Sequence, residues 1–179
     1  TRYFKMAQIL GATMFTFHGY RNIITGNAPL DDGIIDQHCE VLLRLSAAAA
    51  DYGISITQEN VSWCASANPQ YLRRLREELG DKIGFTFDLK QACRANVPFE
   101  EYLSAMGNRI MNIHISDFST DNTCLLPGNG TLDFNYFFKC LREYSYDGPL
   151  IIETYSSAFD NIRQIESSKL WLEHQMVGF

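Results

Sequence analysis

The sequence predicts an α/β fold in which parallel strands alternate with helices along part of a barrel. Short apolar segments typical of buried strands are separated by stretches that are each long enough for one helix, a pattern that indicates a parallel sheet. Four of these segments end on a residue that can bind a metal: Glu59, Asp88, His114 and Glu153. A β/α barrel places the carboxyl ends of its strands on one rim, so we expect the four side chains to meet there.

The N-terminal half of the chain contains the first two predicted strands. Apolar residues recur at helical spacing around them, and glycines mark three helix ends, at Gly11, Gly53 and Gly80. A loop rich in glycine, asparagine and proline, residues 24–33, follows the first strand. We expect strands over Met14–Phe17 and Ile54–Asn60, and helices over Arg2–Leu10, residues 34–53 and Pro69–Leu79.

The C-terminal half repeats the strand–helix unit three more times. A broken helical stretch runs to Gly107, and a long loop over Ser116–Leu132 precedes Asp133, which suits a helix N-cap. We expect strands over Ile83–Asp88, Ile110–His114 and Pro149–Glu153, and helices over Phe134–Tyr144 and Asp160–Gln175.

These elements make five βα units, whereas a complete barrel of eight units takes about 250 residues. The chain has 179 residues and starts inside a predicted helix with no strand before it. We therefore expect a single domain, residues 1–179, that forms the C-terminal five βα units of a barrel, with an open sheet as the alternative. A partial barrel would leave sheet edges that favour pairing with another chain, including a second copy of this one.

Composition argues against several function classes. The chain is 46% hydrophobic and 20% charged, with a formal net charge of -6, and nucleic-acid-binding proteins usually carry a basic face instead. No apolar run approaches the ~20 residues of a membrane span, and no signal peptide is recognisable. The five cysteines include no CxxC pair, which is typical of free thiols in a reducing cytosol. We expect a cytoplasmic protein without a membrane or nucleic-acid partner.

Three carboxylates and one imidazole form a ligand set for one divalent cation. Alone, a strand-end carboxylate often caps a helix, and a histidine in an apolar strand often belongs to the core. Repetition at the same end of four successive strands favours the metal site. We expect Mn²⁺, with Mg²⁺, Co²⁺ and Zn²⁺ as alternatives. A metal stabilises the negative charge of an enediolate, and Glu59 and Glu153 are the natural acid–base pair.

Six short motifs occur in an order typical of one superfamily. They are His18-Gly19, Glu59-Asn60, FDLKQA at 87–92, HISD at 114–117, PGNGTLDF at 127–134 and GPLIIE at 148–153. Together they resemble the xylose isomerase-like TIM-barrel superfamily, in particular its sugar phosphate isomerase/epimerase group, which is related to the AP endonuclease 2 family. The resemblance runs from Gly11 to the end of the chain. It implies a TIM (β/α)8 barrel and a metal-dependent isomerase or epimerase with a small carbohydrate substrate.

The resemblance also implies roles for individual residues. Its metal ligands fall on Glu59, Asp88, His114 and Glu153, and the two glutamates handle the proton in the ketose epimerases. His18 lies where the family often has a histidine that touches substrate or a second metal. Where many members have a histidine, this chain has Gln91, which can bind a sugar hydroxyl but is no comparable metal ligand.

Three further residues have less specific interpretations. Trp63 lies where it could stack on a sugar ring, and Asp117 could orient His114, bind a substrate hydroxyl or support a turn. Lys90 is expected to be exposed on a helix, with contact to a phosphate or carboxylate as the alternative. The PGNG glycines suit a tight turn whose N–H groups could cradle a phosphate.

Two other functions stay open. One is a metal-dependent hydrolase or lyase, such as an AP endonuclease-like phosphodiesterase, which in this superfamily holds three zinc ions. Gln91, a loop without histidine before PGNG and the acidic charge disfavour it and indicate one main metal. The other is a partial barrel that only binds a ligand or assembles with a partner.

Overall fold

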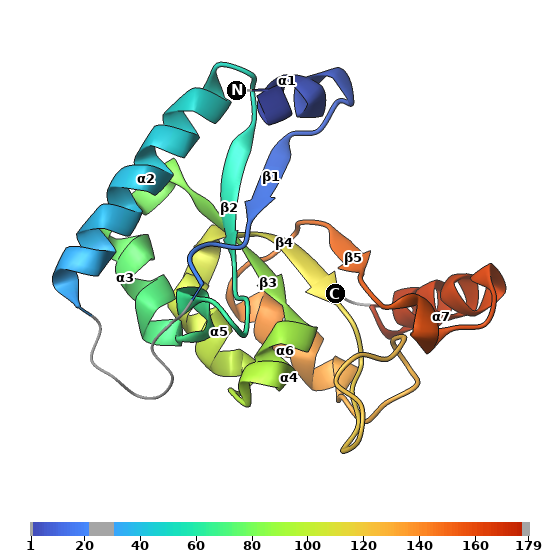
Figure 1. The fold of residues 1–179 in the computed structure, drawn as a ribbon. Coiled ribbons are helices and arrows are strands. Elements are labelled where there is room, and N and C mark those ends of the chain that lie inside the picture. The colour runs from blue at the N-terminus through green and yellow to red at the C-terminus, as the bar shows by residue number, and fades with distance from the viewer. Residues whose placement is uncertain (1, 22–30, 177–179) are drawn as a thin grey trace.

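Five parallel strands form one curved sheet in the computed structural model (Figure 1), which describes residues 2–21 and 31–176. The spatial order of the strands follows the sequence, and each neighbouring pair is parallel. The strands are β1 Met14–Phe17, β2 Ser55–Glu59, β3 Gly84–Asp88, β4 Ile110–Ile115 and β5 Leu150–Ile152. This confirms the predicted α/β fold of five consecutive barrel-like units.

Seven α-helices in the described parts of the chain connect and flank these strands. They are α1 Arg2–Ile9, α2 Asp32–Ala50, α3 Pro69–Leu79, α4 Leu89–Ala95, α5 Phe99–Met106, α6 Phe134–Glu143 and α7 Ile162–Gln175. In Figure 1, α2, α3, α5 and α6 follow one another along one side of the sheet, and α1 and α7 lie near its first and last strands. The predicted broken helix is the pair α4 and α5.

Side-chain caps fix several helix starts where the sequence predicts them. The carboxylate of Asp133 accepts a hydrogen bond from the N–H group of Tyr136, and Asn68 caps α3 before Pro69 at its first position. The last helix begins two residues later than expected, because Asn161 rather than a residue before it is the N-cap. The predicted loop over residues 24–33 falls mainly on residues 22–30, which lie outside the described parts.

The hydrophobic core lies between the sheet and the helices. On β3, Phe85 and Phe87 are fully buried, and the ring of Phe87 packs 6.1 Å from Tyr102 of α5 and 6.2 Å from Phe137 of α6. Because side chains alternate between the two faces of a strand, the residues between these phenylalanines point to the opposite, concave face. The core therefore fixes which strand residues face the interior of the curve.

The concave face is polar beneath the strand ends. The hydroxyl groups of Thr57 and Thr86 lie 2.8 Å apart, and Thr16 of the first strand lies within 3.3 Å of both. Barrel interiors are usually filled by branched apolar side chains, so this hydroxyl layer is unusual. It places polar groups two residues below the strand ends, where the chemistry is expected.

Candidate metal centre

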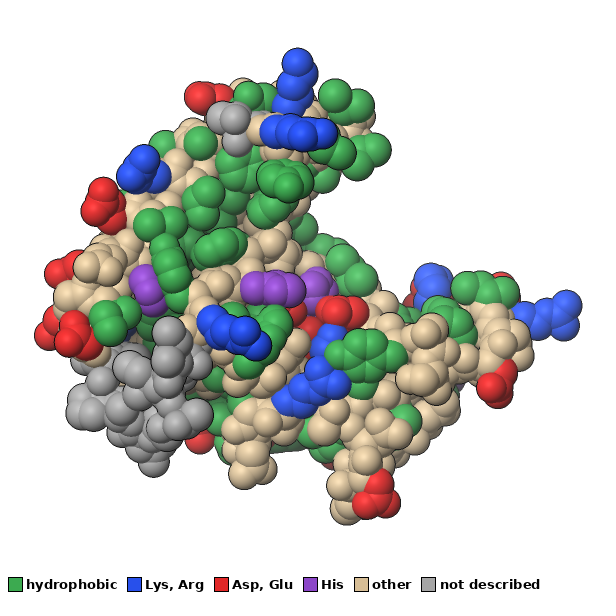
Figure 2. All heavy atoms as spheres, viewed as in Figure 1, with side chains coloured by type: hydrophobic (Ala, Val, Ile, Leu, Met, Phe, Trp, Pro, Cys, Tyr) green, Lys and Arg blue, Asp and Glu red, His purple; other side chains and the backbone are tan. Residues whose placement is uncertain are grey.

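The four predicted metal ligands lie together at the carboxyl ends of four neighbouring strands. Glu59, Asp88, His114 and Glu153 each offer one ligand atom, and these atoms lie within 4.8 Å of one another. Figure 2 shows histidine, acidic and basic side chains gathered in one hollow of the surface. The structure thus brings together all four residues that the sequence singles out.

Strand pairing explains why these side chains meet. Asp88 and His114 are register partners across β3 and β4, and the N–H group of Glu153 donates to the carbonyl of Ile115 at 3.1 Å. Glu59 is the last residue of β2, beside β3 in the sheet. Parallel strands in register present their last inward-facing residues at one level, so the backbone alone positions the four groups.

The ligand atoms are buried and crowded, but they do not satisfy one another by hydrogen bonds. Nδ1 of His114 lies 2.6 Å from Oε2 of Glu153, 3.4 Å from Oε1 of Glu59 and 3.7 Å from Oδ2 of Asp88. Even the shortest contact lacks hydrogen-bond alignment. Among the described residues, His114 Nδ1, Asp88 Oδ2 and Glu153 Oε2 are therefore buried atoms without a hydrogen-bond partner. Such atoms normally find partners, and one cation between them would satisfy all three.

The charges of the centre also fit a divalent cation. Glu59, Asp88 and Glu153 contribute three negative charges when ionised, and the ammonium group of Lys90, within 3.3 Å of two of these carboxylates, contributes one positive charge. With a neutral His114, these side chains carry a net charge of minus two. Buried charges are costly unless they are compensated, and one divalent ion compensates this set completely.

Without a metal, the four groups perturb one another strongly. Burial alone would lower the pKa of His114, but the carboxylates of Asp88, Glu153 and Glu59 outweigh burial and raise it to about 11. Burial raises the pKa of Glu59, and Asp88 adds to this. His114 holds the pKa of Glu153 well below its usual range against the effect of burial, and Lys90 reinforces this. Without a metal, His114 is therefore expected to carry a proton, which a metal ion bound here would have to displace.

Lys90 corrects an expectation from the sequence. It is predicted as an exposed lysine on a helix, but its side chain is only 4% exposed and its Nζ donates to Oε1 of Glu153 at 2.7 Å. The alternative prediction, contact with a carboxylate, is the one that the structure shows. The sequence offers no local indication of burial because Glu153 lies 63 positions further along the chain.

His18 and Trp63 lie at the open edge of the centre. Nε2 of His18 is 3.2 Å from Oε2 of Glu59, and its ring centroid lies 5.6 Å from that of Trp63. Both side chains are exposed, with Trp63 at 43%. Their position is open to a ligand, and their contact with a substrate stays a prediction.

Gln91 and Asp117 are engaged in contacts within the protein. Oε1 of Gln91 accepts hydrogen bonds from the backbone N–H and the hydroxyl of Ser62. The Asp117 carboxylate accepts from the backbone N–H groups of Phe118, Gly128, Gly130 and Leu132. The turn-supporting interpretation of Asp117 therefore fits its contacts, while substrate binding by either residue stays a prediction. The idea that the PGNG glycines cradle a phosphate is wrong in this structure, because their N–H groups point at Asp117.

Asn60 is a supporting residue to which sequence reasoning assigns no role. Its amide donates to the carbonyl of Asp88 at 2.9 Å and accepts from the N–H group of the same residue at 2.6 Å. Asn60 is fully buried, so this pair of hydrogen bonds fixes the backbone of one ligand directly. The Glu59-Asn60 dipeptide was the only indication of such a role in the sequence. Only the fold shows that the side chain of Asn60, after β2, reaches the backbone of Asp88 at the end of β3.

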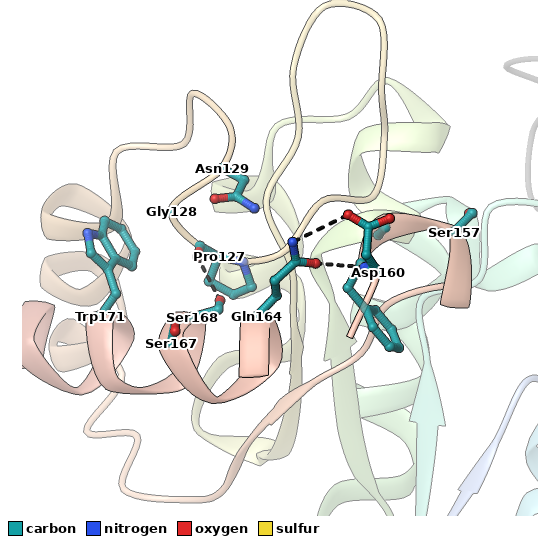
Figure 3. Close-up of a pocket in the computed structure, with 11 residues that line it drawn as sticks. Pro127, Gly128, Asn129, Ser157, Asp160, Gln164, Ser167, Ser168 and Trp171 are labelled. Atoms are coloured by element: carbon teal, nitrogen blue, oxygen red, sulfur yellow. Dashed lines mark hydrogen bonds between the residues drawn. The ribbon is translucent and has the colours of Figure 1, made fainter. Parts of the chain in front are cut away.

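A pocket of about 520 Å³ lies apart from these residues, between the PGNG turn and the last helix (Figure 3). Pro127, Gly128 and Asn129 line one side, and Gln164, Ser168 and Trp171 line the other. Ser168 donates to the carbonyl of Pro127, and Gln164 bonds with Asp160. None of the four metal-centre residues lines this pocket, so it is not the space in which a ligand would meet them.

The fold and the centre define a β/α-barrel protein with a candidate metal site on its rim. Residues 1–175 match the xylose isomerase-like TIM barrel family, and the chain belongs to it. The chain is 31% identical over 147 residues to an uncharacterized protein of Methanocaldococcus jannaschii, covering 78% of this chain and 50% of that protein. It is 25% identical over 157 residues to inosose isomerase of Bacillus velezensis, and the match covers 82% of this chain and 56% of that isomerase. The chain thus spans about half the length of the curated relatives it matches.

Solved structures share the same architecture. A D-tagatose 3-epimerase-like protein, 25% identical, superposes with a TM-score of 0.74 over 97% of this chain and 66% of that chain. The IolI protein, whose structure holds a zinc atom, is 18% identical and superposes with a TM-score of 0.79 over 96% of this chain and 66% of that chain. No helix in the described residues is long and apolar enough to cross a membrane.

Proposed function

We propose that this chain carries the metal centre of a sugar, or sugar phosphate, isomerase or epimerase that moves a proton next to a carbonyl group. The observation that carries the proposal is the presence of two glutamates, Glu59 and Glu153, in one cluster of ligand atoms within 4.8 Å. Two carboxylates in different environments can divide the acid and base steps. The inosose isomerase and the D-tagatose 3-epimerase-like protein among the relatives support this class of reaction.

The roles of the residues follow from their positions. Asp88 and His114 would hold the ion together with the two glutamates. A bound divalent cation supplies Lewis-acid stabilisation of the negative charge that develops on the carbonyl oxygen of the substrate. One glutamate removes the proton from the carbon next to the carbonyl, and the C–H electron pair forms the double bond of an enediolate. The other glutamate, in its protonated form, then gives a proton back. Delivery to the opposite face of the same carbon changes its configuration. Delivery to the former carbonyl carbon, with transfer of the neighbouring hydroxyl proton to the former carbonyl oxygen, moves the carbonyl group.

We expect one metal ion, Mn²⁺ rather than Mg²⁺, Co²⁺ or Zn²⁺, because three carboxylates and one imidazole mix hard and borderline ligands. The net charge of minus two supports a single divalent ion. Substrate oxygens would approach from the open edge of the centre, where His18 and Trp63 are exposed. A small carbohydrate that offers adjacent carbonyl and hydroxyl groups fits this edge.

The test is exchange of substrate protons with solvent. The chain with Mn²⁺ is incubated in deuterated water with D-tagatose, D-allulose, D-fructose or inosose, and deuterium at the carbon beside the carbonyl is measured. Glu153→Gln should abolish exchange while the protein stays folded, and Glu143→Gln, on the exposed surface of α6, should leave exchange unchanged. Exchange that persists in Glu153→Gln would exclude the proposed role. Cleavage of an abasic-site oligonucleotide by the unmodified chain, without sugar exchange, would favour a phosphodiesterase instead.

A further inference from the structure

Lys90 is a buried lysine inside the metal centre that the proposed acid–base roles do not use. It is the second residue of α4 and lies two positions after the ligand Asp88, and its side chain is 4% exposed. Lysines are almost never buried at this level unless they are paired. The buried position of Lys90 therefore depends on the carboxylates with which it pairs, Asp88 and Glu153.

The ammonium group divides its contacts between two of the ligands. Nζ donates to Oε1 of Glu153 at 2.7 Å and lies 3.3 Å from Oδ2 of Asp88. The other oxygen of Glu153, Oε2, faces Nδ1 of His114 at 2.6 Å. The two oxygens of Glu153 thus have different partners: Lys90 holds one, and the other points to the ligand cluster.

A layer of side chains holds Lys90 in this position. Nζ lies 5.4 Å from the centre of the Tyr155 ring, within the range of a cation–π contact. The hydroxyl of Tyr155 accepts a hydrogen bond from Nη1 of Arg94 at 2.8 Å, and Nε of the same arginine donates to Thr123 at 3.2 Å. Arg94 thus holds the Tyr155 ring over Lys90, and the ammonium group of Lys90 stays directed at Glu153.

We propose that Lys90 is a positioning residue of the metal centre. It occupies one oxygen of Glu153, so that this glutamate offers the metal a single oxygen, and it compensates one of the three carboxylate charges. The first role sets the orientation of a glutamate that moves a proton, and in that respect the inference rests on the proposed function. The second role concerns only the affinity for the cation and is independent of the substrate.

The two roles predict opposite effects when the charge is removed. Lys90→Met keeps the length of the side chain but removes a positive charge next to the cation site, so Mn²⁺ should bind at least ~10-fold more tightly. The same variant frees Glu153 to rotate or to bind the metal with both oxygens. Proton exchange should then fall at least ~10-fold, in kcat rather than KM, because orientation in the transition state is lost. A purely structural lysine would instead weaken both properties together.

The experiment compares four proteins: the unmodified chain, Lys90→Met, Lys90→Arg and Lys82→Met. Lys82 is an exposed lysine paired with Asp81, and its variant controls for the loss of a surface charge. Mn²⁺ binding is titrated by calorimetry, Co²⁺ absorption spectra report the coordination of the ion, and exchange into D-tagatose is followed in deuterated water. Lys90→Gln replaces Lys90→Met if the methionine variant does not fold.

The expected result is tighter Mn²⁺ binding, a changed Co²⁺ spectrum and slower exchange in Lys90→Met, with values near the unmodified chain in Lys90→Arg and Lys82→Met. Weaker Mn²⁺ binding in Lys90→Met, or a Co²⁺ spectrum that does not change, would overturn the positioning role. If the unmodified chain exchanges substrate protons and Lys90→Met exchanges them at the same rate, the positioning role is also overturned. If the parent chain exchanges no protons but Lys90→Met still binds Mn²⁺ more tightly, the proposed isomerase function fails while the charge role of Lys90 stands.

Discussion

Substitution of Asn60 by alanine should destabilise the protein strongly, because Asn60 holds the backbone of Asp88 next to the metal centre. The asparagine makes two hydrogen bonds to the backbone of Asp88, at 2.9 Å and 2.6 Å, and it is fully buried. Alanine removes the Asn60 partner from one N–H group and one carbonyl of Asp88, at about 1–3 kcal/mol for each buried group that is left unpaired. We therefore expect a loss of about 3 kcal/mol in the free energy of unfolding, or roughly 6–12 °C in Tm for a chain of this size.

Urea unfolding, followed by circular dichroism, measures this loss directly. Asn122→Ala is a matched control, because Asn122 is an exposed asparagine in the loop after β4, and surface substitutions usually stay within about 0.5 kcal/mol. The Asn60 variant should also bind Mn²⁺ more weakly, since the backbone of a ligand is no longer fixed. A cost below about 0.5 kcal/mol for Asn60→Ala would show that these two hydrogen bonds do not hold Asp88 in solution, and the reasoning would fail.

Two further predictions concern protonation and the loop after β4. The pKa of His114 is raised to about 11 in the metal-free protein, so Mn²⁺ binding at pH 7 should release about one proton and become tighter as the pH rises. Calorimetry in buffers of different ionisation enthalpy measures the number of protons released. Binding without proton release would contradict the protonated state assigned to His114. Asp117→Asn should lower the free energy of unfolding by about 3 kcal/mol, because an amide NH₂ would face N–H groups that now donate to a carboxylate. Asp121→Asn, on an exposed part of the same loop, should have little effect, and equal effects of the two substitutions in urea unfolding would refute the loop-holding role.

The residues that the sequence predicts well are those whose position follows from local pattern. Glu59, Asp88, His114 and Glu153 can be found because each follows a short apolar run, and parallel strands bring such positions to one edge. The predicted helix cap at Asp133 is also local, since its carboxylate bonds to the N–H group of Tyr136, three residues away. For such features, neighbouring residues contain most of the information.

The residues whose roles the sequence leaves open or misassigns depend on contacts between distant segments. Lys90 lies in the first turn of a helix, and nothing near it predicts burial, because the groups that contact it, Glu153 and Tyr155, lie just after the last strand. Asp117 accepts from N–H groups up to 15 residues further on, so its role depends on how the loop folds back. A Cβ atom at Gly130 would collide with this carboxylate, which explains the glycine better than phosphate binding does.

The charges of the centre connect the metal-free and metal-bound states. In the metal-free protein, protons on His114 and Lys90 offset two of the three carboxylate charges, which leaves one negative charge in a buried site. If a divalent ion binds, we expect His114 to lose its proton and Lys90 to keep its own, which would leave the site neutral. The histidine proton thus substitutes for part of the metal charge, whereas the lysine charge is present in both states. The ammonium group of Lys90 can hold Glu153 in the same orientation with and without the metal. We therefore expect the ion to enter a site whose geometry is already set.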